Sequence, residues 1–148
     1  MNEKDVDPVI AIAANLRDAP HWPRSGYEAA LARDVWPKRI ALVAEANGNI
    51  AGFLVAALVP PETELESIAV AEEFQRRGVA RALFERLVEE IRRRNSTQIL
   101  LEVRFSNRAG RGFYTALGFR EAGSRAGYYV DPVEDALVMR LELTGKLL

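Results

Sequence analysis

A stretch in the middle of the chain has the residue types that bind phosphate. Gln75-Arg76-Arg77-Gly78-Val79-Ala80 follows an apolar segment that ends at Val70 and opens a segment of helical periodicity. The N-terminus of a helix carries unpaired N–H groups and the positive end of the dipole, so it attracts anions. Gly78 has no Cβ and allows close approach of a ligand, and three nearby arginines, including Arg81, add charge. These features are compatible with a pyrophosphate cradle and equally with a plain strand–loop–helix that has a solvated basic loop.

A second candidate for chemistry is an acidic residue inside an apolar run. Glu102 interrupts the predicted strand 98–104. An acid near a strand end is commonly solvated or ion-paired, here with Arg104 as the nearest cation in sequence. It can also be a base held at the mouth of a cleft. The residues alone leave both interpretations open.

Composition excludes several classes of protein. The chain has 148 residues, 49% apolar and 28% charged, which suits one globular domain over residues 1–148. A formal net charge of -1 gives no overall field that would recruit nucleic acid. The sequence has no cysteine, which excludes disulfides and thiolate chemistry, and His21 is its only histidine, so we expect no metal site. We find neither a membrane-length apolar run nor a signal peptide, and we expect a cytoplasmic protein.

Apolar periodicity and turn residues predict the order of the elements. We expect helices at 6–17 and 26–34, strands at 40–45, 50–58 and 64–70, a helix at 78–94, a strand at 98–104, a helix at 108–117, and two final strands at 119–130 and 135–143. The first three strands can form an antiparallel meander. The strand–helix–strand unit that follows should place its strands parallel, with a right-handed crossover. The result is a mixed-sheet α/β domain with helices on both faces.

Several segments together resemble one family. The loop at 75–80 resembles the acetyl-coenzyme A loop of the GNAT superfamily of N-acetyltransferases, Gln/Arg-x-x-Gly-x-Gly/Ala, and Ala80 stands where many members carry glycine. Leu101-Glu-Val-Arg104, Ser106-Asn107 and Phe113-Tyr-Thr-Ala-Leu-Gly-Phe119 resemble the family's second signature, in the right order and spacing. The match covers about Glu64 to Leu143. The subgroup most alike is the ribosomal-protein-alanine N-acetyltransferase, which modifies a protein N-terminus.

The resemblance implies a fold and a cosubstrate. The fold is α+β, with a mostly antiparallel sheet of about six to seven strands and a splayed parallel pair that holds acetyl-CoA. The N–H groups of 76–81 would bind the pyrophosphate, 68–70 would run beside the pantetheine, and Asn107 would hydrogen-bond the pantetheine arm. The residues implied in binding acetyl-CoA are Ile68, Ala69, Val70, Arg76, Arg77, Gly78, Val79, Ala80, Arg81 and Asn107.

The resemblance also implies catalytic roles. The N–H of Val70 would polarise the thioester carbonyl, Glu102 would accept the proton of the attacking amine directly or through water, and Tyr114 would protonate the departing thiolate. Tyr128 and Tyr129 would line the peptide groove, unless they are ordinary strand aromatics. A core tyrosine is the alternative for Tyr114.

The predicted activity is transfer of an acetyl group from acetyl-CoA to the N-terminal α-amine of a protein such as a ribosomal protein, without a covalent enzyme intermediate. The alternatives are acetylation of a small amine or a lysine side chain, and a non-catalytic acyl-CoA-binding module. A nucleotide-binding protein is disfavoured, because the loop lacks both Gly-Lys-Ser/Thr and Gly-x-Gly-x-x-Gly. The sequence does not indicate the oligomeric state.

Overall fold

The computed structural model describes residues 1–143 of the chain. These residues form two short 3-10 helices, η1 and η2, four α-helices and six strands. In chain order they are η1 (Glu3–Asp5), α1 (Val6–Ala14), α2 (Arg24–Leu31), β1 (Lys38–Ala46), β2 (Asn49–Val59), β3 (Glu62–Val70), η2 (Glu72–Phe74), α3 (Val79–Arg92), β4 (Gln98–Arg104), α4 (Arg108–Ala116), β5 (Arg120–Val130) and β6 (Val133–Glu142).

The six described strands form one mixed sheet in the order β1-β2-β3-β4-β6-β5. β1, β2 and β3 make an antiparallel meander, and β6 pairs antiparallel with both β4 and β5. β3 and β4, which α3 connects, are the parallel pair. The predicted α+β architecture, with its meander and its strand–helix–strand unit, is confirmed.

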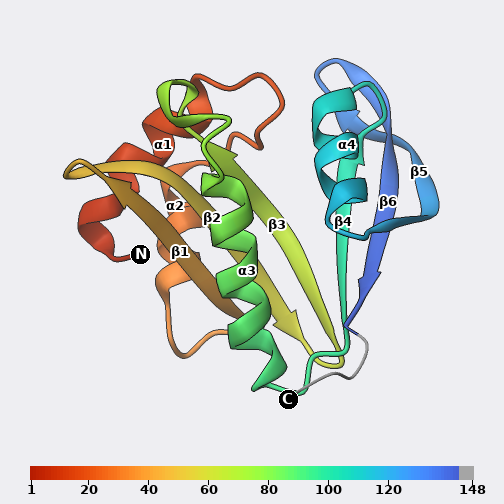
Figure 1. The fold of residues 1–148 in the computed structure, drawn as a ribbon, viewed down its shortest axis with the longest axis horizontal. Coiled ribbons are helices and arrows are strands. Elements are labelled where there is room, and N and C mark those ends of the chain that lie inside the picture. Colours follow the sequence, from red (N-terminus) through yellow and green to blue (C-terminus); the bar gives the residue numbers. More distant parts are fainter. Residues whose placement is uncertain (144–148) are drawn as a thin grey trace.

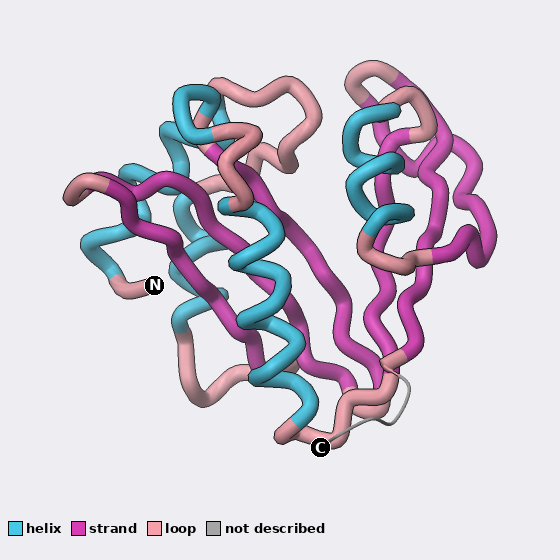
Figure 2. Tube along the Cα trace, viewed as in Figure 1, coloured by secondary structure: helices cyan, strands magenta, loops and turns pink. Residues whose placement is uncertain are grey.

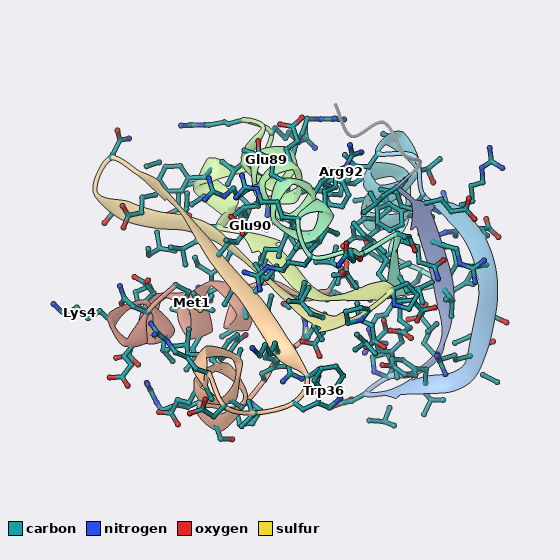
Figure 3. The ribbon with its side chains drawn as sticks, turned by 90° about the horizontal axis from the view of Figure 1, so that it is seen from below. Met1, Lys4, Trp36, Glu89, Glu90 and Arg92 are labelled. Atoms are coloured by element: carbon teal, nitrogen blue, oxygen red, sulfur yellow. The ribbon has the colours of Figure 1, made fainter. Side chains whose placement is uncertain are left out.

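Helices cover both faces of the sheet (Figure 1). α3 and α4 lie on one face, where Leu83, Leu87 and Ile91 pack with apolar residues of β1, β2, β3, β4 and β6 in the larger core cluster. α1 and α2 lie on the other face, where the buried Tyr27 and Phe53 belong to a second cluster. Figure 3, seen from below, places Glu89, Glu90 and Arg92 on one side of the strands and Met1 and Lys4 on the other.

The parallel pair separates soon after it begins. β3 and β4 pair over three rungs, Glu62–Gln98, Thr63–Ile99 and Glu64–Leu100. Beyond these rungs the strands diverge, and the sheet opens like a V whose arms are β1–β3 and β4–β6 (Figure 2). The loop between α1 and α2 and the turn between β5 and β6 flank the open end (Figure 1). The predicted splayed pair is confirmed.

The boundaries of the first two helices differ from our predictions. α1 ends at Ala14 instead of residue 17, and the two backbone bonds that follow are of the i→i−3 kind, to Ile12 and Ala13. α2 begins at Arg24, two residues earlier than predicted, and ends at Leu31. Extended Pro23 precedes α2, and its carbonyl accepts from Gly26. Arg24 also forms an ion pair with Asp7 of α1, which favours the earlier start.

The N-terminus of α4 depends on one asparagine and one glycine. Asn107 is the N-cap, and its Oδ1 accepts a hydrogen bond of 2.8 Å from the N–H of Gly110. A Cβ at Gly110 would lie 2.6 Å from Asn107 Nδ2 and 2.9 Å from its Cγ, which is closer than real contacts allow. A Cβ at Gly112 would meet nothing within 4 Å. A Cβ at Gly110 would therefore displace the Asn107 side chain from its present capping position, whereas a Cβ at Gly112 has room.

This difference gives a matched pair of substitutions. Gly110→Ala should leave the free energy of unfolding nearly unchanged, because loss of the cap, about 1 kcal/mol, offsets the helix propensity gained, also about 1 kcal/mol. Gly112→Ala should stabilise it by roughly 0.5–1 kcal/mol through propensity alone. Urea unfolding of both variants measures the difference. Equal shifts in the same direction would contradict the role of the Asn107 cap.

Candidate active site

The last residues of β3 turn backbone groups toward the gap. The N–H of Ala71 donates to Ala51 O at 2.8 Å, beside the Val70–Gly52 pair. Because antiparallel pairs alternate between bonded and non-bonded rungs, the N–H and C=O of Val70 face away from β2, and those of Ile68 do the same. The side-chain amide of Gln75 donates to Val70 O at 3.0 Å, which agrees with this orientation. An extended ligand in the gap could therefore bind β3 as an added strand.

The start of α3 is arranged to receive an anion. Gly78 is its N-cap in the left-handed conformation (φ 80°), and within residues 1–143 no side chain caps the helix. Arg76 is also left-handed (φ 64°), which costs about 1 kcal/mol or more for a residue with a side chain. Turns of this kind direct successive N–H groups to one point. Arg76, Arg77 and Arg81 are exposed around them.

Asn107 lies across the gap, at the end of α4 nearest the turn after β4. Its Oδ1 is used by the cap, so its amide Nδ2 is the group that would reach a pantetheine arm. The sequence predicted the start of this helix at Asn107, and the contact with pantetheine stays a prediction.

Glu102 lies on β4 beyond the last rung shared with β3. Its Oε2 accepts a hydrogen bond of 3.0 Å from Arg125 Nε, and the side chains are 30% and 58% exposed. Arg125 belongs to β5 and reaches over Ala136, the buried β6 residue that pairs with it. The pairing with Arg104 that we considered from sequence is wrong, because Arg104 forms its ion pair with Glu134.

Tyr114 comes from α4 on the same arm of the V. Its ring packs edge-on against Phe119 and Phe113, at centroid distances of 5.6 and 5.4 Å, and adjoins the larger core cluster. Burial raises the pKa of its hydroxyl, and nearby Tyr129 raises it further. A hydroxyl with a raised pKa keeps its proton at neutral pH and can donate it to a leaving group.

Tyr128 and Tyr129 lie near the end of β5. Tyr128 is 50% exposed, and its ring meets that of Tyr129 edge-on at 5.0 Å. Burial raises the pKa of Tyr129 to about 12, with further contributions from Tyr128 and then Glu102. Tyr129 therefore lies within electrostatic reach of both Glu102 and Tyr114. The structure brings four sequence-predicted residues together on this arm.

Glu64 is a carboxylate that our sequence analysis missed. It forms the last rung with Leu100, so it lies where the two arms meet, two β4 residues before Glu102. Burial raises the pKa of Glu64, and Glu102, Glu66 and Glu62 raise it further. Only the parallel register reveals that Glu64 and Glu102 are neighbours, since 38 positions separate them in sequence.

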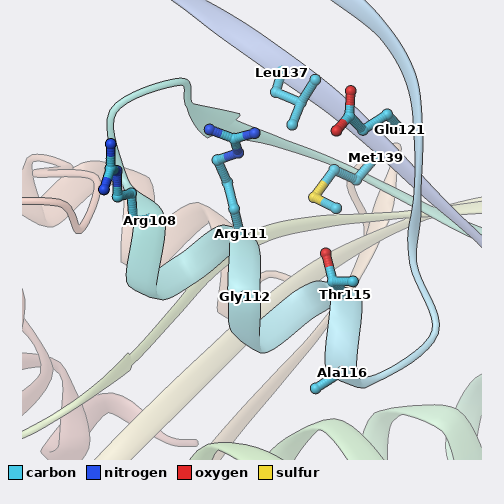
Figure 4. A pocket seen from close by; sticks show the side chains of 8 residues that line it. All are labelled: Arg108, Arg111, Gly112, Thr115, Ala116, Glu121, Leu137 and Met139. Carbon is cyan, nitrogen blue, oxygen red and sulfur yellow. The ribbon is translucent and has the colours of Figure 1, made fainter.

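A well-defined groove in the described part of the chain lies elsewhere. It has a volume of about 540 Å³ and separates α4 from β5 and β6 (Figure 4). Arg108, Arg111 and Thr115 line one side, and Glu121 and Met139 line the other. These α4 residues are on the side of the helix away from the core-packed Tyr114. Neither of the predicted catalytic residues, Glu102 and Tyr114, lines this groove.

The residues of the V fit acetyl-CoA as a cosubstrate. The uncapped start of α3 would hold its pyrophosphate, and the gap-facing groups of Ile68 and Val70 would hold the pantetheine. In residues 1–143 no group of three His, Asp or Glu side chains could bind a metal ion. None of the described helices is long and apolar enough to cross a membrane.

Comparison with known proteins agrees with this geometry. Residues 10–119 match the acetyltransferase (GNAT) family. The [ribosomal protein bS18]-alanine N-acetyltransferase of Escherichia coli K12 is 42% identical over 100 residues, which are 66% of this chain and 68% of that protein. The crystal structure of the ribosomal-protein-S18-alanine N-acetyltransferase from Escherichia coli superimposes with a TM-score of 0.83 at 32% identity, covering 100% and 95% of the two chains. Ard1 from Thermoplasma volcanium gives 0.87 at 26% identity, covering 98% and 95%.

The chain belongs to the GNAT family of acetyltransferases, whose members use acetyl-CoA as the acyl donor. It is an N-acetyltransferase, and over its length its structure is similar to that of a ribosomal-protein-S18-alanine N-acetyltransferase.

The carboxylates at the apex of the V lead to a prediction about stability. A raised pKa means that the folded state disfavours the charged form of Glu64. Ionisation of Glu64 therefore lowers the stability of the fold as pH rises above 4.5, the ordinary pKa of a glutamate. Glu64→Gln should therefore unfold at a higher temperature than the wild type at pH 7. The difference in unfolding temperature between variant and wild type should vanish at about pH 4, where Glu64 is protonated in the unfolded chain as well. Thermal unfolding at both pH values tests this, and a less stable variant at pH 7 would contradict repulsion at this site.

Proposed function

We propose that this enzyme acetylates the N-terminal α-amine of a protein that begins with alanine, and that its acceptor is a ribosomal protein of the bS18 kind. The observation that carries this proposal is the 42% identity to the Escherichia coli enzyme of that activity, together with the separation of β3 from β4 after three rungs. We further propose that residues 1–148 act as one domain. A ribosomal acceptor would place the reaction in the cytoplasm.

The proposed mechanism is direct transfer. Acetyl-CoA supplies the acetyl group as a thioester. The Val70 N–H donates to the carbonyl oxygen and stabilises the negative charge that develops on it. The acceptor amine forms the new C–N bond, and Glu102 takes its proton directly or through water. Tyr114 donates a proton to the sulfur as the C–S bond breaks.

The chemistry of the acceptor is consistent with one carboxylate base. A protein α-amine has a pKa of about 8, whereas a lysine amine has a pKa of about 10.4. A larger share of α-amine is therefore neutral at pH 7, and one base near the gap suffices to complete its deprotonation. This difference favours an N-terminus over a lysine side chain only mildly, so the acceptor has to be tested directly.

A panel of peptides tests the acceptor. The full chain is incubated with acetyl-CoA and peptides that begin with alanine, serine or methionine, each containing an internal lysine. A matched alanine peptide with a blocked N-terminus is the control. Mass spectrometry should show one acetyl group on the free N-terminus, with alanine preferred. Acetylation of the blocked peptide at lysine, or of small amines only, would overturn the proposal. Binding of acetyl-CoA without any transfer would indicate a binding module.

The role of Tyr114 is tested by removing its hydroxyl. Tyr114→Phe should lower kcat by about 100-fold, because a general acid contributes that much or more, while the Kd for acetyl-CoA changes little. Tyr27→Phe is the matched control, since Tyr27 is a fully buried tyrosine of the other face whose hydroxyl has no partner in residues 1–143. It should keep full activity. An unchanged kcat in Tyr114→Phe would remove Tyr114 from the acid role.

A further inference from the structure

We propose that Arg104 positions the β5–β6 hairpin and the Tyr129 ring at the edge of the gap, and thereby determines how the acceptor binds. This inference rests on the proposed function in one respect, namely that the acceptor enters between Glu102 and the tyrosines of β5. Arg104 itself is a positioning residue, since it acts through the hairpin.

Arg104 holds the turn of the hairpin through backbone carbonyls. Its Nη1 donates to Pro132 O at 3.1 Å, and its Nη2 donates to Asp131 O at 3.3 Å. Its Nη1 also donates to Glu134 Oε1 at 3.3 Å. The two side chains of this ion pair are only 18% and 19% exposed, so the pair is better shielded than an ordinary surface pair. The last residue of β4 therefore fixes the hairpin turn to the arm of the V.

The same guanidinium stacks on Tyr129. Its central carbon lies 4.3 Å from the centroid of the ring, within the range of a cation–π interaction. Tyr129 and Glu134 pair with each other across β5 and β6, so Arg104 contacts both members of one rung. Glu134 Oε2 also accepts from the Ser106 N–H at 2.6 Å, next to the cap of α4. One arginine thus connects β4, the hairpin and the start of α4.

The hairpin needs this support because its own ladder is interrupted. β5 is an edge strand that is exposed along nearly all its length. Its pairing with β6 shifts between Arg125 and Tyr129, so residues 126–128 have no regular partner. The N–H of Gly127 donates to Asp135 Oδ1 at 2.9 Å. Beyond the irregularity only two rungs remain, Tyr129–Glu134 and Val130–Val133. Arg104 supplies the contacts that the ladder lacks at this point.

The position of Tyr129 explains why its support would affect the acceptor. Tyr129 stacks on Arg104, and Arg104 lies two residues from Glu102 on β4, so the side chains of Arg104 and Glu102 share one face of the strand. The raised pKa values of Tyr129 and Tyr114 agree with this placement, since Glu102 contributes to the first and Tyr129 to the second. Tyr129 is therefore near both the proposed base and the proposed acid, on the side of the gap away from the acetyl-CoA residues of β3 and α3. Displacement of its ring should change binding of the amine more than binding of acetyl-CoA.

Lysine cannot reproduce these contacts. A guanidinium is planar, carries five donors in a fixed fork and stacks on aromatic faces, whereas an ammonium is a compact charge on a flexible stem. Arg104→Lys keeps the charge and should recover only part of the function. Arg104→Met removes the charge and the fork but retains a long side chain.

The test compares wild type, Arg104→Met, Arg104→Lys and the control Arg120→Met, whose arginine is exposed at the far end of β5. In Arg104→Met the KM for the peptide should rise by about tenfold or more, the loss expected when a charge-assisted contact is removed. The Kd for acetyl-CoA should stay within about twofold. The peptide KM of Arg104→Lys should lie between those of the wild type and Arg104→Met, and the peptide KM of Arg120→Met should match that of the wild type.

Hydrogen exchange of residues 126–134 is measured on the same proteins without substrate. Exchange should become faster there in Arg104→Met, while β1–β3 stays protected. Unchanged exchange, or faster exchange with an unchanged peptide KM, would overturn the inference. A wild type that acetylates no peptide N-terminus would overturn the proposed function instead, and the KM comparison is then made with the amine that the wild type does acetylate.

Discussion

The structure depends on one interrupted interaction, the parallel pairing of β3 with β4. The two strands share three rungs and then separate, which leaves the backbone groups of Ile68 and Val70 directed into a gap. Unpaired backbone donors and acceptors are costly where water is excluded. Gln75 already donates to the C=O of Val70, and a ligand with its own amides lying along β3 would bind the remaining groups and extend the sheet. The broken pair is therefore the feature on which the proposed site for a pantetheine arm depends.

The two arms of the V contribute different parts of the site. β3 and α3 carry the backbone groups and arginines that would hold acetyl-CoA. β4, α4 and β5 carry Glu102, Tyr114 and Tyr129, which would act on the acceptor and the leaving group. The distance between the arms consequently sets the distance between the thioester and the groups that act on it. The hairpin held by Arg104 is the outermost part of the second arm, where the acceptor would enter.

Much of the fold could be predicted from sequence because its signals are local. The apolar stripe Leu83, Leu87 and Ile91 predicts α3, the asparagine at 107 predicts the start of α4, and the loop with Gly78 predicts an anion site. Helix ends were less accurate: α2 begins early because of Pro23 and the Arg24–Asp7 ion pair, and no periodicity encodes that pair.

The parts of the site that escaped prediction depend on strand register. Glu64 and Glu102 become neighbours through the parallel rungs, and Arg125 reaches Glu102 because β5 lies beyond β6 at the sheet edge. The sequence also does not predict the irregular pairing of β5 with β6, which is the reason that the contacts of Arg104 matter. These contacts join residues of different strands, and one sequence does not specify which residues face each other.

The most direct test of this account is the response of backbone amides to acetyl-CoA in two-dimensional NMR spectra. The account predicts the largest shifts at Ile68, Val70 and residues 76–81 on one arm, with smaller shifts at Asn107 and Tyr114 on the other. Shifts confined to the α4–β5 groove, at Arg108, Arg111, Glu121 and Met139, with Val70 and residues 76–81 unchanged, would contradict it.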